Sequence, residues 1–143
     1  MLSLTCKNAI KAVIFLSSQS ERGERAGIKE VAGQIKASEH TVGKILQQLA
    51  RRRIINSLKG PHGGFYLSEE QQEQPVINIV EAIEDDRIFK ECGLGLSECS
   101  SLRPCPIHNE YKVARELMEK IFRERKVRTL CKSVNDGLAY LID

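Results

Sequence analysis

The 143-residue sequence has no long hydrophobic run, and this absence excludes several classes of protein. No stretch approaches the roughly 20 consecutive apolar residues that a membrane-spanning helix needs. The apolar run from Ala12 to Leu16 is too short for the hydrophobic region of a secretory signal, and no cleavage site follows it. The sequence also contains no internal repeat and no low-complexity tract. We therefore expect a soluble, cytoplasmic protein with no membrane partner.

Hydrophobic residues make up 41% of the sequence and charged residues 29%, a balance typical of a soluble globular fold. The five cysteines are an odd number, and three of them are close together in one polar segment. In a reducing cytosol such cysteines more often bind metal or sense redox state than form structural disulfides. The other two, Cys6 and Cys131, fall in expected helices, where we interpret them as small buried hydrophobic residues.

The net charge of +3 conceals an asymmetry between the two halves of the chain. Residues 1–67 carry 11 Lys and Arg against 4 Asp and Glu, whereas residues 68–143 carry 11 against 15. A basic N-terminal half points to a polyanionic partner, most simply nucleic acid. The acidic half is expected to face elsewhere.

The spacing of apolar residues predicts helices over residues 6–19, 28–35 and 39–52. The third helix has an apolar stripe with a period of about 3.6 residues, formed by Val42, Ile45, Leu46 and Leu49. Ser38 stands just before it, and serine is a favoured N-cap. Two helices joined by a short turn are the helix-turn-helix signature.

Two strand-like runs follow, at residues 54–58 and 64–67. The segment from Gly60 to Gly64 between them is rich in glycine, which predicts the tip of a β-hairpin. A helix-turn-helix followed by a hairpin is a winged helix, which we assign to residues 1–67. Residues 68–75 are polar and end in proline, which predicts a linker. The expected fold is mainly α with a small β-hairpin wing.

The exposed face of the helix over residues 39–52 predicts a surface that binds double-stranded DNA. In helix-turn-helix proteins the second helix enters the major groove, where its N-terminal residues meet the bases. His40, Thr41 and Lys44 are candidates for base contacts, Ser38 and the arginines for phosphate, and the wing tip for the minor groove or backbone. The candidates are Ser38, His40, Thr41, Lys44, Gln47, Arg51, Arg52, Lys59 and His62. A plain solvated face, or a winged helix that contacts protein, is the alternative.

Residues 76–143 are predicted to hold dimerisation helices. A short amphipathic helix is expected over residues 76–85, a long one over 106–126 and a last short one over 129–134. The long helix has a wide apolar stripe that comprises Ile107, Tyr111, Ala114, Leu117, Met118, Ile121 and Phe122. A partner helix from a second copy is the simplest cover for this stripe, and packing against the chain's own first helix is the alternative.

Four potential metal ligands occur in and just after the polar loop at about residues 87–108. Cys92, Cys99, Cys105 and His108 have the spacing C-x6-C-x5-C-x2-H. Thiolate and imidazole suit zinc and iron–sulfur iron far better than calcium or magnesium. Pro106 is expected at the first helical position with Cys105 as N-cap, so that Cys105 and His108 share a helix face. Spacing alone does not separate zinc from iron–sulfur. The alternative to a metal site is four unrelated polar residues in a surface loop.

With these features in place, the sequence resembles the Rrf2 family of winged-helix repressors, which includes IscR and NsrR. The resemblance is carried by Leu4-Thr5 at the start of the first helix, the recognition-helix pattern from Ser38 to Leu49, and Gly60-Pro61-His62-Gly63-Gly64 at the wing. The three clustered cysteines followed by His108 complete it, and it covers nearly the whole chain. The resemblance implies a homodimeric repressor, a palindromic operator, and an iron–sulfur cluster near the dimer helix that alters DNA binding.

The resemblance places Cys92, Cys99 and Cys105 as iron ligands. In the IscR branch a histidine three residues past the last cysteine is the fourth ligand of a 2Fe–2S cluster, and His108 matches that position. In the NsrR branch a carboxylate of the first helix completes a 4Fe–4S cluster, but residues 7–10 contain no carboxylate. We therefore favour His108 and a 2Fe–2S cluster. A 4Fe–4S cluster stays open, because the first interval is six residues rather than the five of both branches.

Two other functions compete with this interpretation. The cysteines of a winged-helix regulator would also serve as a thiol–disulfide switch or a zinc switch. An enzyme would use Cys105 as nucleophile and His108 as base, but the sequence offers no orienting group, oxyanion site or substrate pocket. We therefore do not expect an enzyme.

Overall fold

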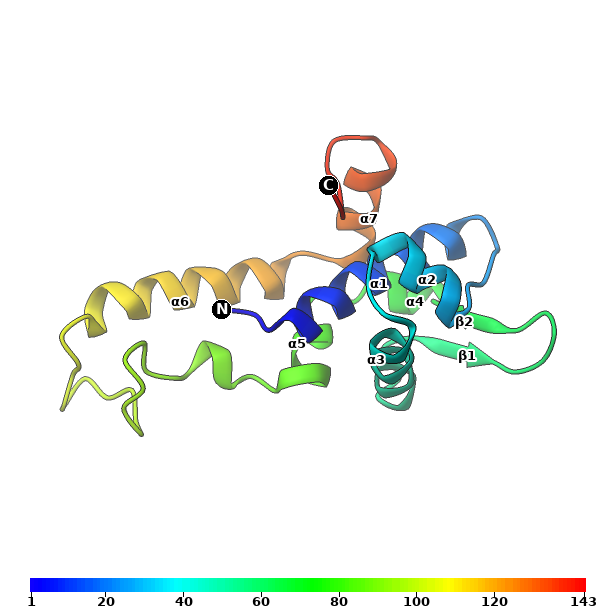
Figure 1. Cartoon of the computed structure of the whole chain (residues 1–143). Helices are drawn as coiled ribbons and strands as arrows, with labels where there is room; N and C mark the ends of the chain where they lie inside the picture. The colour runs from blue at the N-terminus through cyan, green and yellow to red at the C-terminus, as the bar shows by residue number, and fades with distance from the viewer.

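A computed structural model describes all 143 residues as a helical protein with one small antiparallel hairpin (Figure 1). This confirms the expected fold class. The elements are α1 Leu4–Glu21, α2 Ile28–Ile35, α3 Glu39–Arg51, β1 Asn56–Leu58, β2 Gly64–Tyr66, α4 Glu69–Gln72, α5 Ile77–Glu84, the 3₁₀ turn η1 Arg87–Phe89, α6 His108–Glu124 and α7 Val127–Asn135. No helix is long and apolar enough to cross a membrane.

The turn between α2 and α3 is formed by local chemistry. Helix α2 ends at Lys36, which adopts a left-handed conformation with φ 53°. Helix α3 begins after Ser38, whose hydroxyl accepts a hydrogen bond from the backbone N–H of Thr41 at 3.2 Å. Gly43 of α3 faces Ile28 of α2, where an added Cβ would make an ordinary van der Waals contact of 3.4 Å with its Cδ1 atom. The helix-turn-helix is therefore present with the predicted cap.

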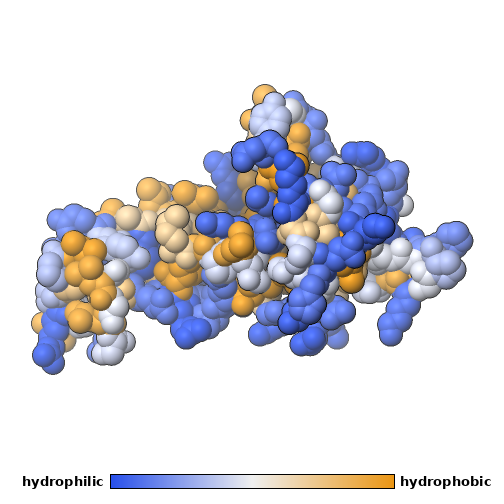
Figure 2. Space-filling view, in the orientation of Figure 1, coloured by the Kyte–Doolittle hydropathy of each residue, from blue (hydrophilic) through white to orange (hydrophobic).

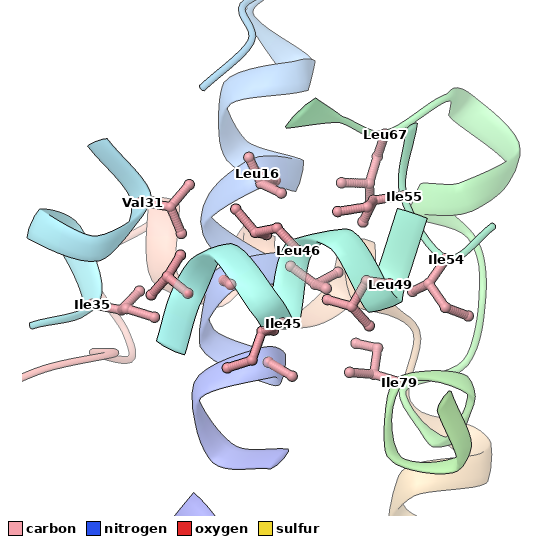
Figure 3. Close-up of a cluster of buried hydrophobic side chains, with 14 of the residues drawn as sticks. Leu16, Val31, Ile35, Ile45, Leu46, Leu49, Ile54, Ile55, Leu67 and Ile79 are labelled. Carbon is pink, nitrogen blue, oxygen red and sulfur yellow. The ribbon is translucent and has the colours of Figure 1, made fainter. Parts of the chain in front are cut away.

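The main core joins both halves of the chain (Figure 3). Leu16 of α1, Leu46 of α3 and Leu49 of α3 are fully buried, and each such side chain contributes about 1.5–3 kcal/mol by its removal from water. Ile79 of α5 and Val127 of α7 belong to the same cluster. The acidic half therefore packs directly on the helix-turn-helix.

The wing is shorter than predicted at its first strand and has an extra contact. Strand β1 pairs antiparallel with β2 from Asn56 opposite Tyr66 to Leu58 opposite Gly64. Ile54 and Ile55, expected in the strand, are buried in the core instead. Ala26 adds a bridge to Phe65 through two backbone hydrogen bonds of 3.1 and 2.8 Å.

The segment 68–75 differs from the expected linker. It contains α4, which starts with a capping box between Ser68 and Gln71, and it buries the side chain of Gln72. Its end pairs with the end of α6: the Val76 N–H donates to the Arg125 carbonyl at 2.8 Å, and the Val127 N–H donates to the Gln74 carbonyl at 3.0 Å. We call this pairing, centred on Pro75 and Lys126, the base bridge.

Helix α6 projects away from the winged half, with the cysteine-bearing loop at its far end (Figure 1). Its Phe122 ring lies 6.0 Å from that of Phe89 in η1, and Met118 packs on the same small cluster around Cys6. Part of the apolar stripe of α6 therefore packs on its own chain. Helix α7 packs back along α1.

Candidate metal centre and DNA interface

The structure brings the four predicted ligands together as two pairs. The Cys99 sulfur lies 3.4 Å from Nδ1 of His108. The Cys92 and Cys105 thiols lie close enough for each to shift the pKa of the other. Cys92, Cys105 and His108 are buried, and Cys99 is half-buried. One pair thus combines two sulfurs, and the other combines a sulfur with an imidazole nitrogen.

The start of α6 differs from the prediction. The helix begins at His108 with Ile107 at the N-cap, so Cys105 is not the cap. Pro106 and Ile107 form a turn in which the His108 N–H donates to the Cys105 carbonyl at 3.0 Å. This turn still places the Cys105 carbonyl against the first residue of the helix, so the two ligand-bearing residues stay close.

The two thiols of the first pair have different acidity. Backbone N–H groups of Leu94 and Leu96 hydrogen-bond to the Cys92 sulfur and lower the pKa of that thiol, because they stabilise the thiolate. Burial raises the pKa of Cys105, and the neighbouring Cys92 and Cys99 thiols add to the increase. Cys92 is therefore the readier of the two to ionise.

No group of three or more His, Cys, Asp or Glu side chains converges on a single point where one metal ion would bind. A zinc site normally needs four donors around one centre. A 2Fe–2S cluster instead has two iron atoms, and sites with both cysteine and histidine ligands are known for it. The donor types and the paired arrangement fit a two-iron group better than a single ion.

One face of α6 holds the cysteine-bearing loop in place. His108, Tyr111 and Arg115 are spaced three and four residues apart, which puts them on one side of the helix. Gly93 lies flat on the Tyr111 ring, so that an added Cβ would be 2.8 Å from two ring carbons. The Arg115 guanidinium donates to the Glu91 carbonyl. The loop is therefore fixed on both sides of Cys92.

The two remaining cysteines lie outside this site. Cys6 and Cys131 are fully buried, in agreement with the prediction that they are small core residues. Burial, with a smaller contribution from the Glu84 carboxylate, raises the pKa of Cys6 to about 12. Burial also raises the pKa of Cys131.

The exposed side of α3 carries most of the predicted DNA-binding residues. The side chains of His40, Lys44, Gln47, Arg51 and Arg52 are exposed, and Thr41 is half-exposed. The Ser38 hydroxyl is exposed but already donates to Oγ1 of Thr41 at 2.8 Å. To donate a hydrogen bond to a DNA phosphate, as predicted, the Ser38 hydroxyl would therefore have to give up its bond to Thr41.

The neighbouring Gln48 is half-buried, and its side chain contacts the acidic half of the chain. Its side-chain amide donates to the Ala82 carbonyl of α5 at 2.7 Å. This bond connects the recognition helix directly to the acidic half.

The wing tip presents Lys59 and His62, both exposed, as predicted. Arg25 is not among the residues predicted from the sequence, but its guanidinium lies 5.1 Å from the centre of the Tyr66 ring in β2. Such a cation–π contact holds a positive charge at the base of the wing. In the sequence Arg25 stands in a charged loop with no sign of its position. It is placed beside the wing by the bridge between Ala26 and Phe65, which are far apart in the chain.

A second side of α6 stays uncovered. Val113, Leu117 and Ile121 are 66, 59 and 50% exposed, and we call them the α6 ridge. Figure 2 shows hydrophobic residues gathered over this part of the molecule. The apolar stripe expected as one surface is therefore divided between the chain's own small cluster and an exposed ridge.

Residues 2–133 match the Rrf2 family, described as an iron-dependent transcriptional regulator. The chain is 24% identical over 134 residues to the HTH-type transcriptional regulator NsrR of Oceanobacillus iheyensis, which covers 93% of this chain and 90% of that protein.

Among solved structures, CymR, the global cysteine regulator of B. subtilis, matches with a TM-score of 0.74 at 15% identity over 92% of this chain and 96% of that one. T. potens IscR matches with a TM-score of 0.73 at 14% identity over 98% and 92%. The structural matches show the shared fold, and the family match shows the kinship. The chain belongs to the Rrf2 family of DNA-binding transcriptional regulators, which are not enzymes.

Proposed function

We propose that this regulator is a homodimeric repressor whose binding to operator DNA depends on an iron–sulfur cluster held by Cys92, Cys99, Cys105 and His108. The observation that carries the proposal is the pairing of these ligands, Cys92 with Cys105 and Cys99 with His108. Each iron of a 2Fe–2S cluster takes two protein ligands in a four-ligand site, so we favour this type over 4Fe–4S. When bound, the cluster supplies an anionic, redox-active group.

The α6 ridge supports the homodimer. A ridge of large aliphatic side chains on a protruding helix is unfavourable in water and suits a symmetric contact with the same helix of a second copy. Leu117 and Ile121 are four residues apart and therefore lie on the same face of the helix. In such a dimer the ridges cover each other.

The exposed side of α3 and the wing supply the DNA interface. We assign His40, Thr41 and Lys44 to base contacts in the major groove. Ser38, Gln47, Arg51 and Arg52 flank them for the phosphate backbone, and Lys59 and His62 reach the adjacent backbone or minor groove. The opposite side of helix α3 is buried in the core, so this exposed side is the one available to contact DNA.

Contacts inside the chain connect α5, the helix that precedes the cysteine-bearing loop, to α1 and to the recognition helix. The Ser3 N–H at the start of α1 donates to the Glu84 carboxylate at the end of α5, at 3.0 Å. The Gln48 amide of α3 donates to the carbonyl of Ala82, which is also in α5, at 2.7 Å. A change of the loop that shifts α5 therefore reaches both α1 and α3.

A thiol switch is the second candidate. The lowered pKa of Cys92 makes it the better nucleophile, and the neighbouring Cys105 thiol is the partner with which it would form a disulfide. Staphylococcus aureus CymR, which shares the fold with a TM-score of 0.69, has been solved in an oxidized form. Formation of the disulfide would transfer two electrons and two protons to an acceptor such as a peroxide, which is reduced to water or alcohol, and would leave Cys99 and His108 unchanged.

Anaerobic reconstitution with iron and sulfide separates the two candidates. The proposal expects coloured protein with two iron and two sulfide per chain, a changed absorption spectrum in His108→Ala, and operator affinity that differs from that of the apo-protein. His62→Ala is the matched control, because it removes a histidine at the wing and should leave the spectrum unchanged. Colourless protein that forms a reversible Cys92–Cys105 disulfide would favour the switch and refute the cluster.

A further inference from the structure

A buried cation lies against the cysteine-bearing loop without an acidic partner. Arg115 is only 9% exposed. Its Nη1 atom donates to the Glu91 backbone carbonyl, and its Nε atom has no hydrogen-bond partner. None of the ion pairs in the structure includes Arg115. Arginine keeps its proton in proteins, so the positive charge remains.

This arrangement is unlike that of the other cations on α6. Lys112, Lys120 and Arg123 each pair at the surface with a glutamate four residues further on or back. A charge taken out of water costs several kcal/mol unless a counter-charge and hydrogen bonds offset the loss. A single backbone carbonyl does not provide that counter-charge. The position of Arg115 therefore calls for an anion that the chain's own carboxylates do not supply.

The direction of the side chain indicates where that anion lies. Arg115 is seven residues after His108, so the two project from the same side of α6, two turns apart. Long side chains on a helix lean back toward its N-terminus, which here means toward His108. The carbonyl that Arg115 holds belongs to the residue immediately before Cys92. The guanidinium thus lies between the two segments that carry the ligands.

We propose that Arg115 is a positioning residue that supplies the counter-charge to the thiolate-ligated iron–sulfur group. The proposal rests on the function proposed above. Thiolates and sulfides give such a group a net negative charge, which increases when it accepts an electron. A nearby buried cation stabilises the reduced form more than the oxidised form, and so raises the reduction potential. The hydrogen bond to the Glu91 carbonyl fixes the approach of Cys92.

The test is the midpoint potential of reconstituted protein, titrated anaerobically with dithionite and redox dyes and followed by visible absorption. Arg115→Met, neutral and similar in length, should have a lower potential than wild type. Arg115→Lys should retain most of the wild-type value. Lys112→Met is the matched control: it removes a charge from an exposed position on the same helix, where solvent and salt screen it, and should leave the potential unchanged.

The outcomes separate this inference from the proposed function. Wild-type protein that takes up no iron and sulfide overturns both. Coloured variants in which Arg115→Met and Lys112→Met have the same potential overturn the role of Arg115 alone. A weaker dimer with an unchanged potential in Arg115→Met also overturns it, because the partner would then be a carboxylate of the second copy.

Circular dichroism of the apo-proteins controls for folding. Loss of an unpaired buried charge should leave the melting temperature of Arg115→Met equal to or above that of wild type. If Arg115→Met does not fold, Arg115→Gln carries the same prediction for the potential.

Discussion

Replacement of Gly93 by alanine should loosen the metal centre while leaving the fold intact. A Cβ at this position would lie 2.8, 2.8 and 2.9 Å from three carbons of the Tyr111 ring. Ordinary carbon–carbon contacts are about 3.5–4.0 Å, so the loop must move by about 1 Å. Overpacking of this kind costs roughly 1–3 kcal/mol. We expect the loop to relieve the strain by moving away from α6, which separates Cys92 from the ligands on the helix side.

The expected result is therefore a loss of iron retention of roughly 5- to 150-fold, since about 1.4 kcal/mol corresponds to a factor of ten. The melting temperature of the apo-protein should fall by about 2–12 °C, because each 1 kcal/mol lowers it by roughly 2–4 °C. Iron transfer to a chelator, followed by absorbance, measures the first effect, and calorimetry measures the second.

A double-mutant cycle tests the steric reason. In a Tyr111→Ala background, Gly93→Ala should cause little further loss, because the ring that it meets is gone. Gly95→Ala is the matched control in the same loop: its φ of +76° brings some strain, but no atom lies within 4 Å of its Cβ. Full iron retention by Gly93→Ala, or equal losses in both backgrounds, would refute the reasoning.

Four further predictions follow from the surface and the buried charges. Leu117→Glu places a charge in the α6 ridge and should give monomers in analytical ultracentrifugation with unchanged helix content; a persistent dimer would contradict the assigned interface. Arg51→Ala should weaken DNA binding uniformly across sequences and reduce the slope of log affinity against log salt by about 1, measured by fluorescence anisotropy; an unchanged slope would remove it from the phosphate contacts. The Lys126 ammonium hydrogen-bonds to the Glu73 carboxylate and lowers its pKa below the usual 4.5, so this carboxylate stabilises the fold above that pH and the stabilisation is lost as the pH falls. In thermal melts at a series of pH values, Glu73→Gln should therefore be less stable than wild type near neutrality and equal to it at low pH. A difference that stays constant with pH would refute this. The Cys6 thiol, with its pKa near 12, should resist iodoacetamide at pH 8 until denaturant is added, as mass spectrometry would show; rapid native labelling would contradict its burial.

The helix-turn-helix and the wing were predictable because local chemistry determines them. The apolar period of α3 and the Ser38 cap act within a few residues, and the glycines at the wing tip permit only a tight turn. At Gly63 an added Cβ would lie 2.0 Å from the Leu58 carbonyl oxygen, so the hairpin requires glycine there. The four potential ligands were likewise visible, because soft donors at short spacing are rare in a polar loop.

Other features could not be predicted from residue type and spacing. Pro106 has the residue type of a first helical position but lies in the preceding turn, because the Cys105 carbonyl bonds to the His108 N–H. The division of the α6 stripe depends on where η1 brings Phe89. Arg115 looks like any surface arginine in the sequence, and only the path of the loop past Glu91 buries it.

The base bridge determines how the protruding part of the molecule moves. Helix α5 is anchored in the core, but the projecting helix α6 rejoins the winged half at the base bridge, so α6 behaves as a lever with its pivot at the bridge. A helix of 17 residues is roughly 25 Å long, so a displacement of 1 Å at the cysteine end tilts the lever by only about 2°. Small adjustments at the metal centre are thus attenuated before they reach Val127 in the core. An effective signal therefore needs a large change at the far end, such as the release of the whole loop from α6.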